Sequence, residues 1–263
     1  MATARPPEPV YYEPVRLPAR RTLPRDAAQQ WLITGWDYFR QHPVVSTTYG
    51  TVFALIGLAI TWLGLAQPQF ILTFWTGFLL VGPLLAIGLY RVAQLHDRGE
   101  TISLATCWSS VRSRLGPTAL FSLLLTLIMV AWIRFSTLIA AIYVGNITGT
   151  SSFINAMASP EGVGFLLVLV GVGGVFAAIM FALTAWSLPT ILDGRTDLGT
   201  AVVTSVKATM EQPLPMLTWG AVVGGLTIVG MLTLFVGFAV IFPWLGYATW
   251  AAYKDLFGIT ENP

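Results

Sequence analysis

The sequence predicts an all-α membrane protein that crosses the bilayer six times. The first reason is composition, because the 263 residues are 55% hydrophobic and 10% charged, whereas a typical soluble domain has about 25% charged residues. The second is that long charge-free runs alternate with short segments that hold the Lys, Arg, Asp and Glu residues. The third is that Lys and Arg gather in alternate segments, as they do in the cytoplasmic loops of membrane proteins.

The clearest membrane span is the apolar run at residues 118–142. As a helix rising about 1.5 Å per residue it would extend roughly 37 Å, enough to cross a hydrocarbon core of about 30 Å. Within this run lies Arg134, the only charged residue set inside one of the long apolar runs. Its position about 25 Å from Pro117 predicts that it lies near the outer interface.

The other charge-free runs supply five further spans. The stretch between Glu211 and Lys254 would reach about 63 Å as one helix, twice the core thickness, so we divide it at a break between Gly230 and Gly237. The six predicted spans are 49–66, 70–90, 118–142, 163–191, 214–233 and 236–257.

Each pair of spans follows a segment with the pattern of an amphipathic helix at the cytoplasmic membrane surface. Asp26 and Asp197 are candidate N-caps of the first and third of these helices. The predicted apolar stripes are Ala28, Leu32, Trp36 and Phe39; Ile102, Ala105, Trp108, Val111 and Leu115; and Leu198, Val202, Val206 and Met210.

A proline lies between each surface helix and the spans that follow it. Proline has no backbone N–H and disfavours a helical residue before it, so Pro43, Pro117 and Pro213 are the predicted corners. The order of surface helix, proline and two spans thus occurs three times, which predicts three parallel hairpin units. The pattern alone does not distinguish true repeats from a coincidence of common juxtamembrane helices.

The placement of charge predicts the orientation of the chain. With six spans, Arg134 is the only one of the 14 Lys and Arg residues on the outer side, so both termini are expected in the cytoplasm. Residues 1–26 are rich in proline and arginine and are predicted to be a disordered tail near anionic lipid. Residues 27–258 form the membrane domain, and residues 259–263 form a short tail.

Three segments carry a resemblance to a known family. They are Trp31-Leu32-Ile33-Thr34-Gly35-Trp36-Asp37 with His42-Pro43 and Tyr49-Gly50; Ser187-Leu188-Pro189-Thr190-Ile191-Leu192-Asp193; and Pro243-Trp244-Leu245-Gly246-Tyr247-Ala248-Thr249-Trp250 with Tyr253-Lys254-Asp255. Over roughly residues 31–256 the chain resembles a bacterial integral membrane protein family of unknown function, some members of which are labelled as cytochrome c oxidase subunits. The resemblance implies six helices in the bacterial inner membrane and no established activity. Tyr247 stands where the family has His.

The inventory of reactive residues argues against catalysis. Haem and copper need clusters of His or Cys, but the chain has only His42, His96 and Cys107. We expect both histidines at the surface, and no cofactor, metal or catalytic constellation. A net charge of +2 gives no basic field for nucleic acid.

Two sets of residues are candidates for contacts. Gly174 with Ala178, and Gly220 with Gly224, have the four-residue spacing that lets membrane helices approach closely. Arg134 and Glu161 are a candidate ion pair at the outer ends of the third and fourth spans, or a site for a partner.

These observations predict a non-catalytic membrane protein that acts as an accessory, assembly or interaction subunit and contacts lipid and other membrane proteins. The alternative is a transporter or channel for a small solute between the three hairpins, with Arg134 selecting anionic cargo. The two hypotheses differ in whether a continuous polar cavity reaches the membrane midplane.

Overall fold

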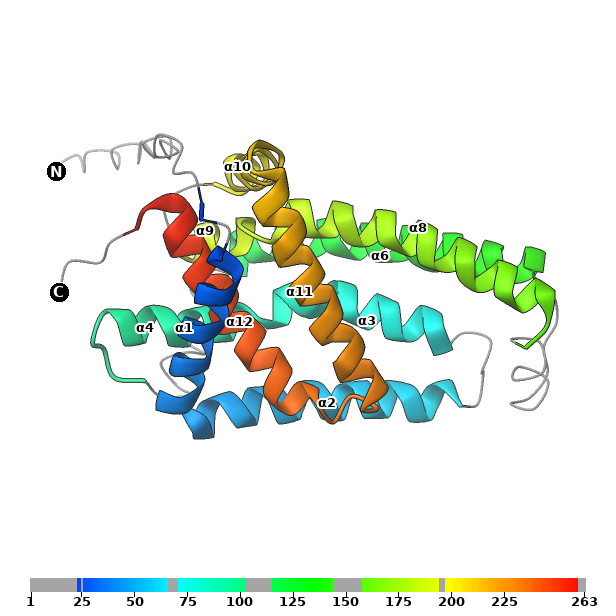
Figure 1. Cartoon of the computed structure of the whole chain (residues 1–263), viewed down its shortest axis with the longest axis horizontal. Helices are drawn as coiled ribbons and strands as arrows, with labels where there is room; N and C mark the ends of the chain where they lie inside the picture. Colours follow the sequence, from blue (N-terminus) through cyan, green and yellow to red (C-terminus); the bar gives the residue numbers. More distant parts are fainter. Residues whose placement is uncertain are drawn as a thin grey trace, which may run out of the picture.

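A computed structural model gives the fold of residues 23, 24, 26–65, 71–102, 115–143, 158–193 and 197–259. The predicted all-α class is confirmed, because the regular structure of these residues is helical throughout. The helices form an elongated bundle in which α2, α3, α6 and α8 follow the long axis, whereas α11 and α12 cross it obliquely (Figure 1). The helices are α1 (Ala27–Gln41), α2 (Pro43–Gly64), α3 (Ile71–Leu85), α4 (Ile87–Asp97), α6 (Leu115–Tyr143), α8 (Pro160–Thr184), α9 (Ser187–Asp193), α10 (Leu198–Glu211), α11 (Pro213–Leu232) and α12 (Phe238–Phe257).

Four segments among the described residues are long and apolar enough to cross a membrane. They are Pro43–Gly64, Leu120–Tyr143, Pro160–Asp193 and Pro213–Leu232, and they overlap four of the six predicted spans. The predicted span at 70–90 corresponds instead to α3 and α4, which join at Ala86. The predicted span at 236–257 corresponds to α12, which carries charged residues near its carboxyl end.

The break predicted between Gly230 and Gly237 is confirmed, because α11 ends at Leu232 and α12 begins at Phe238. Leu234 and Phe235 in this turn have positive φ angles of 50° and 68°, a conformation that costs free energy for residues other than glycine. Phe235 is fully buried and its ring packs edge-on against Trp75 at 5.6 Å. Burial of this ring offsets the backbone cost.

Helix α12 packs against α1, α2, α4 and α11, and glycines let α1, α2 and α4 approach closely. A methyl group added at Gly50 of α2 would lie 2.0 Å from the Ala239 carbonyl oxygen, and one at Gly35 of α1 would lie 2.6 Å from the Ala248 nitrogen. On α12 itself, a methyl group at Gly246 would meet the side chain of Leu89 in α4 at 2.7 Å. The contacts of α12 with α1, α2 and α4 therefore depend on the absence of a side chain.

The buried face of α1 differs from the predicted apolar stripe. The helix buries Ala27, Ala28, Trp31, Gly35 and Tyr38, so only Ala28 of the predicted set is buried. The reason is that α1 packs against α12, which the periodicity could not reveal. Of the predicted stripe, Leu32 and Phe39 are half-buried and Trp36 is exposed.

Helix α10 gives a similar correction, because it buries Ala201, Thr204, Ser205 and Ala208, whereas its predicted stripe is half-buried or exposed. The predicted cap is confirmed, since the Asp197 carboxylate accepts hydrogen bonds from the backbone N–H of Gly199 and Thr200. Asp26 stands at the N-cap of α1 without a side-chain capping bond. Most of the stripe from Ile102 to Leu115 lies outside the described residues.

Two of the predicted proline corners share one geometry. His42, before Pro43, has φ −127° and ψ 57°, and Gln212, before Pro213, has φ −126° and ψ 62°. Counted back from the two prolines, the buried positions of the preceding helices also coincide, namely Trp31 with Ala201, Gly35 with Ser205 and Tyr38 with Ala208. Pro117 lies within α6, and the residues before Leu115 are outside the described part of the chain.

Candidate functional site

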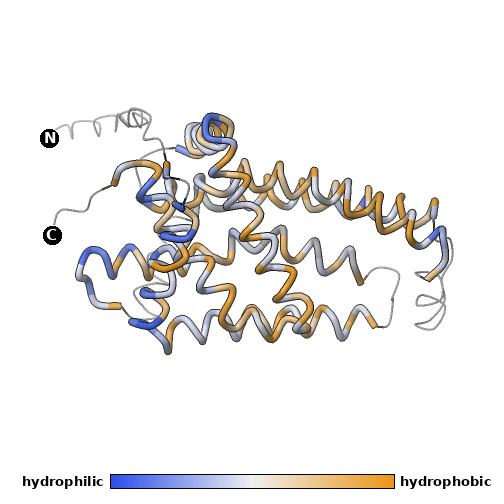
Figure 2. The backbone as a smooth tube through the Cα atoms, in the orientation of Figure 1, coloured by the Kyte–Doolittle hydropathy of each residue, from blue (hydrophilic) through white to orange (hydrophobic). Residues whose placement is uncertain are grey.

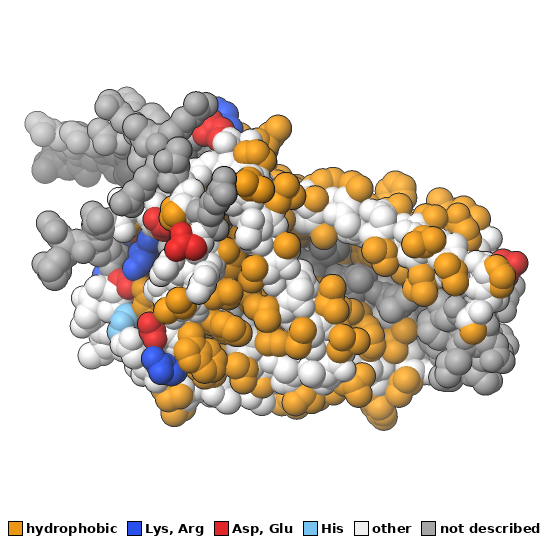
Figure 3. Space-filling model, in the orientation of Figure 1, with side chains coloured by type: hydrophobic (Ala, Val, Ile, Leu, Met, Phe, Trp, Pro, Cys, Tyr) orange, Lys and Arg blue, Asp and Glu red, His pale blue; other side chains and the backbone are white. Residues whose placement is uncertain are grey.

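Charged side chains gather at one end of the bundle. Figure 3 shows Lys, Arg, Asp and Glu side chains mainly at one end of the visible face, with an acidic side chain also at the opposite tip, while apolar side chains cover much of the surface between. Figure 2 shows the same division along the backbone. Three aspartates lie at or near the carboxyl ends of helices here: Asp97 ends α4, Asp193 ends α9 and Asp255 lies in the last turn of α12.

Asp97 joins α4 to α1 and α12. Its carboxylate accepts a hydrogen bond from Trp250 Nε1 at 2.9 Å and another from the Tyr38 hydroxyl, and it forms an ion pair with Lys254 Nζ at 2.6 Å. Lys254 also donates to the Tyr38 hydroxyl oxygen at 3.0 Å. The Asp97 and Lys254 side chains are only 10% and 23% exposed, so these charges depend on one another for compensation.

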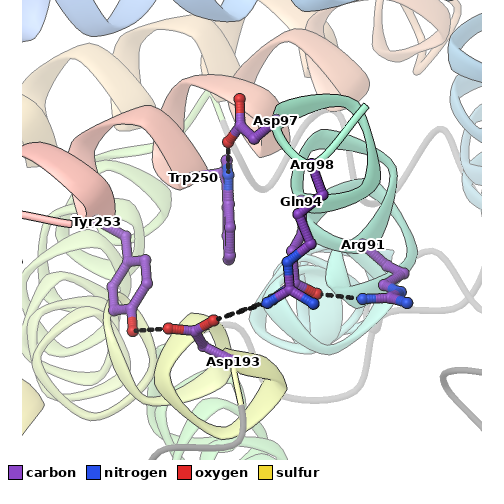
Figure 4. Close-up of polar contacts among 7 residues, drawn as sticks. All are labelled: Arg91, Gln94, Asp97, Arg98, Asp193, Trp250 and Tyr253. Carbon is purple, nitrogen blue, oxygen red and sulfur yellow. Dashed lines mark hydrogen bonds and ion pairs between the residues drawn. The ribbon is translucent and has the colours of Figure 1, made fainter. Parts of the chain in front are cut away.

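Asp193 joins α9 to α4 and α12 (Figure 4). Gln94 Nε2 donates to its carboxylate at 3.0 Å, Tyr253 donates at 3.4 Å, and the Arg98 guanidinium lies 3.5 Å away. Arg91 Nη1 in turn donates to Gln94 Oε1 at 2.5 Å. The Asp193 side chain is only 4% exposed, so its negative charge is stabilised by donors from two neighbouring helices.

The third aspartate extends this pattern to α1. Asp255 accepts a hydrogen bond from Trp31 Nε1 at 3.0 Å. The Trp31 ring is buried and packs edge-on against Trp219 of α11 at 5.5 Å. Each of the three carboxylates therefore accepts a hydrogen bond from a side chain of another helix. Together these bonds connect α1, α4, α9 and α12 at one end of the bundle.

The two histidines also meet here. His42 Nε2 lies 2.9 Å from His96 Nδ1, and the Tyr38 ring packs edge-on against His96 at 5.1 Å. The sequence did not predict this contact, which arises because the corner at Pro43 brings His42 against the end of α4. Both histidines remain partly exposed. Burial, and then the nearby His96, lower the pKa of His42 below its ordinary value of 6.5.

Tyr247 of α12 is fully buried and is linked to His42 through Ser46. Its hydroxyl forms a hydrogen bond of 2.9 Å with Ser46 Oγ, which donates to the His42 carbonyl oxygen at 2.6 Å. Tyr247 thus links α12 to the corner between α1 and α2.

Hydrogen bonds hold the helix ends together here. We refer to the carboxylates of Asp97, Asp193 and Asp255 and their side-chain partners Trp31, Tyr38, Gln94, Trp250, Tyr253 and Lys254 as the latch. Among the described residues, no group of three or more His, Cys, Asp or Glu side chains is placed to hold a metal ion. The three carboxylates already accept bonds from Trp, Tyr, Gln or Lys side chains. The described side chains at this end are therefore arranged to hold helices together.

The predicted ion pair does not form within the described residues. Arg134 and Glu161 are both exposed. Tyr143, at the end of α6, lies level with Gly164 of α8, since a methyl group added at Gly164 would be 3.2 Å from the Tyr143 ring. Glu161 in the first turn of α8 therefore lies near Tyr143, far along the helix from Arg134.

The predicted packing glycines lie on helix faces that no described neighbouring helix covers. A methyl group at Gly174, Gly220 or Gly224 would meet no atom within 4 Å, and Ala178 is exposed. Close helix contacts are made at other glycines, most tightly at Gly50. The four-residue spacing was insufficient to identify them because it does not say which face of a helix is covered.

The sequence reasoning missed the residues of the latch as a set. Trp31, Asp193, Lys254 and Asp255 lie within the segments that carry the family resemblance, which was an available signal. Asp97 lies outside those segments, but like Asp193 it ends a short helix that follows a long apolar one. That shared position could have indicated a common role.

We predict that Asp97→Asn destabilises the protein by about 2–3 kcal/mol, because Lys254 would remain largely buried without its counter-charge. The melting temperature in nanodiscs should fall by roughly 5–10 °C. Asp37→Asn is the matched control, since the Asp37–Arg40 pair is 47% and 64% exposed and should contribute about 0–1 kcal/mol. Equal melting temperatures for the two variants would contradict the role of Asp97.

We also predict that acid weakens the corner at Pro43. Because the pKa of His42 is lower in the folded protein than in the unfolded chain, the unfolded chain binds more protons as the pH falls below 6.5, and stability falls with it. His42→Gln should flatten this dependence, since Gln212 occupies the equivalent corner with the same backbone angles. Melting temperatures between pH 8 and pH 5.5 test the idea, and an unchanged slope in the variant would refute it.

The comparisons with known proteins agree with a membrane location. Residues 70–193 match the model of a family described as "Predicted integral membrane protein (DUF2189)". No curated protein and no solved structure matches the chain significantly. The matched region covers α3, α4, α6, α8 and α9, and it includes Asp97 and Asp193 but neither α1 nor α12. Together with the apolar helices, this similarity identifies an integral membrane protein with no assigned function.

Proposed function

We propose that the chain crosses the bacterial inner membrane six times with its charged end in the cytoplasm. The six segments are α2, α3 with α4, α6, α8 with α9, α11 and α12. The support is that Lys and Arg of the described part lie at the charged end apart from Arg134, and such residues favour the cytoplasmic side. In this arrangement α1 and α10 lie at the cytoplasmic surface as amphipathic helices.

Cysteine labelling tests this orientation. In a Cys107→Ser background, a membrane-impermeant maleimide should label Ala158→Cys in intact spheroplasts, because that position precedes α8 at the outer end and is exposed. Thr101→Cys, exposed beyond the end of α4, should react only after lysis. The reverse pattern would show that the topology is inverted.

Within this membrane frame, we propose that the protein is a non-catalytic interaction subunit, an accessory or assembly component of a membrane complex. The observation that supports this most is the packing of large side chains in the three hydrophobic clusters between the helices. The fully buried side chains include Trp132, Trp186, Trp219, Trp250, Tyr247, Tyr253, Phe121 and Phe235. A transporter or channel needs a polar path to the midplane, and this packing leaves that alternative without support.

The outer surface supports the same proposal. Only 11% of the apolar window in Pro160–Asp193 is buried, and 22% of that in Leu120–Tyr143. Helices α6 and α8 extend side by side beyond the rest of the bundle (Figure 1). Such an arm exposes apolar surface to lipid or to other membrane helices.

Co-purification tests the proposed role. Cells that express the tagged protein are grown on light isotopes and mixed with untagged cells grown on heavy isotopes. The mixture is then lysed, and the tagged protein is extracted in polymer nanodiscs and purified. We expect at least one other integral membrane protein at a fixed stoichiometry and with only the light label, because a bound partner does not exchange after lysis. Recovery of the chain with lipid alone, or with partners of mixed label only, would contradict an interaction subunit.

A further inference from the structure

The outward face of α6 is an apolar stripe interrupted by one arginine. Arg134 is exposed and follows Val130 and precedes Leu138 by one helical turn each. The exposed apolar residues of this face are Leu120, Leu123, Leu127, Val130, Leu138 and Ile142. We refer to these six residues and Arg134 as the α6 stripe.

The opposite face of α6 packs inside the bundle. The Ser136 hydroxyl accepts a hydrogen bond from Thr73 of α3 at 3.0 Å, and Trp132 packs against Phe176 of α8 at 5.4 Å. Both residues are two positions from Arg134, which places them on the other side of the helix. Arg134 therefore faces away from the interior, where charged residues of membrane helices are normally found.

Arg134 also lies deep along the helix. It precedes Tyr143, the last residue of α6, by nine positions, so about 13 Å along the axis. Trp132 lies level with Gly173, in the apolar middle of α8, because a methyl group at Gly173 would be 3.1 Å from the Trp132 ring. The expectation that Arg134 lies near the outer interface is therefore corrected, because α6 continues nine residues beyond it. In the proposed topology, its depth is close to the middle of a hydrocarbon core of about 30 Å.

The arginine is poorly placed to reach the outer lipid headgroups. Side chains of a helix lean toward its amino terminus. Helix α6 begins near the charged end of the bundle, since Phe121 belongs to the same core cluster as Trp250. Arg134 therefore leans away from the outer surface, and the charged end is about 28 Å away along α6 from Leu115. No described residue forms an ion pair with it.

We propose that the α6 stripe binds a transmembrane helix of a different protein, and that an Asp or Glu of that helix pairs with Arg134 inside the membrane. This rests on the proposed interaction function and names the chemistry of the partner. A positive charge at this depth is costly unless a negative charge lies beside it, and an Asp or Glu carboxylate at the same depth would supply that charge. A second copy cannot supply one, because the acidic residues of the described part lie at the charged end, or in Glu161 near the outer tip.

Photo-crosslinking in living cells tests the proposal. A photoreactive benzoylphenylalanine is placed at Val130 or Leu138 on the stripe, and at Leu167 of α8 or Ile228 of α11 as equally exposed apolar controls. Crosslinks from the two stripe positions should map by mass spectrometry to a membrane span that contains Asp or Glu. Arg134→Gln should reduce their yield about tenfold, at unchanged abundance of the protein, whereas Arg134→Lys should retain most of it.

The strongest confirmation is a charge exchange, in which Arg134→Asp abolishes the crosslink and replacement of the partner's acid by Arg restores it. Crosslinks to a second copy, to lipid alone, or to a span without an acid would overturn the inference, as would an unchanged yield in Arg134→Gln. If a partner co-purifies but crosslinks only from Leu167 or Ile228, the proposed function holds and this inference fails. If no protein co-purifies or crosslinks, both fail.

Discussion

The close approach of three helices to α12 is the constraint on which the structure depends. Gly35, Gly50 and Gly246 lie where an added methyl group would overlap a neighbouring helix. Helices separated by larger residues pack 8–10 Å apart, and the absent side chains allow these to come nearer. Because α12 is the last helix, residues far apart in the sequence meet only when the carboxyl-terminal part of the chain is in place.

The packing of these helices against α12 also determines where the buried charged groups lie. Asp97 and Lys254 are far apart in the sequence, yet their groups meet at 2.6 Å because α4 packs against α12 at Leu89 and Gly246. Removing two charges from water is costly unless each retains partners, and Tyr38 and Trp250 supply the remaining hydrogen bonds. The latch is therefore a result of the glycine contacts, and it in turn fixes the end of α1.

Much of the fold could be predicted from the sequence, because the bilayer imposes a length and a polarity on each element. The helical class, the break before Phe238 and the Asp197 cap follow from such local rules. The buried face of α1 could not be predicted, because Trp31 and Gly35 are buried by long-range contacts with Asp255 and with the backbone of α12. The meeting of His42 with His96 depends on the same long-range packing.

Arg134 is best understood by comparison with the charges of the latch. Asp97, Asp193 and Asp255 each have donors from other helices of this chain, at the charged end of the bundle. Arg134 lies on the outward face of the longest helix, among exposed apolar residues and away from every described acid. The buried aspartates of the described part are compensated by side chains of this chain. Arg134 lacks such a partner among the described residues, which supports the proposal that its compensation comes from another protein. The physical rule that explains the charged end of the bundle is thus the same rule on which the proposed role of the α6 stripe rests.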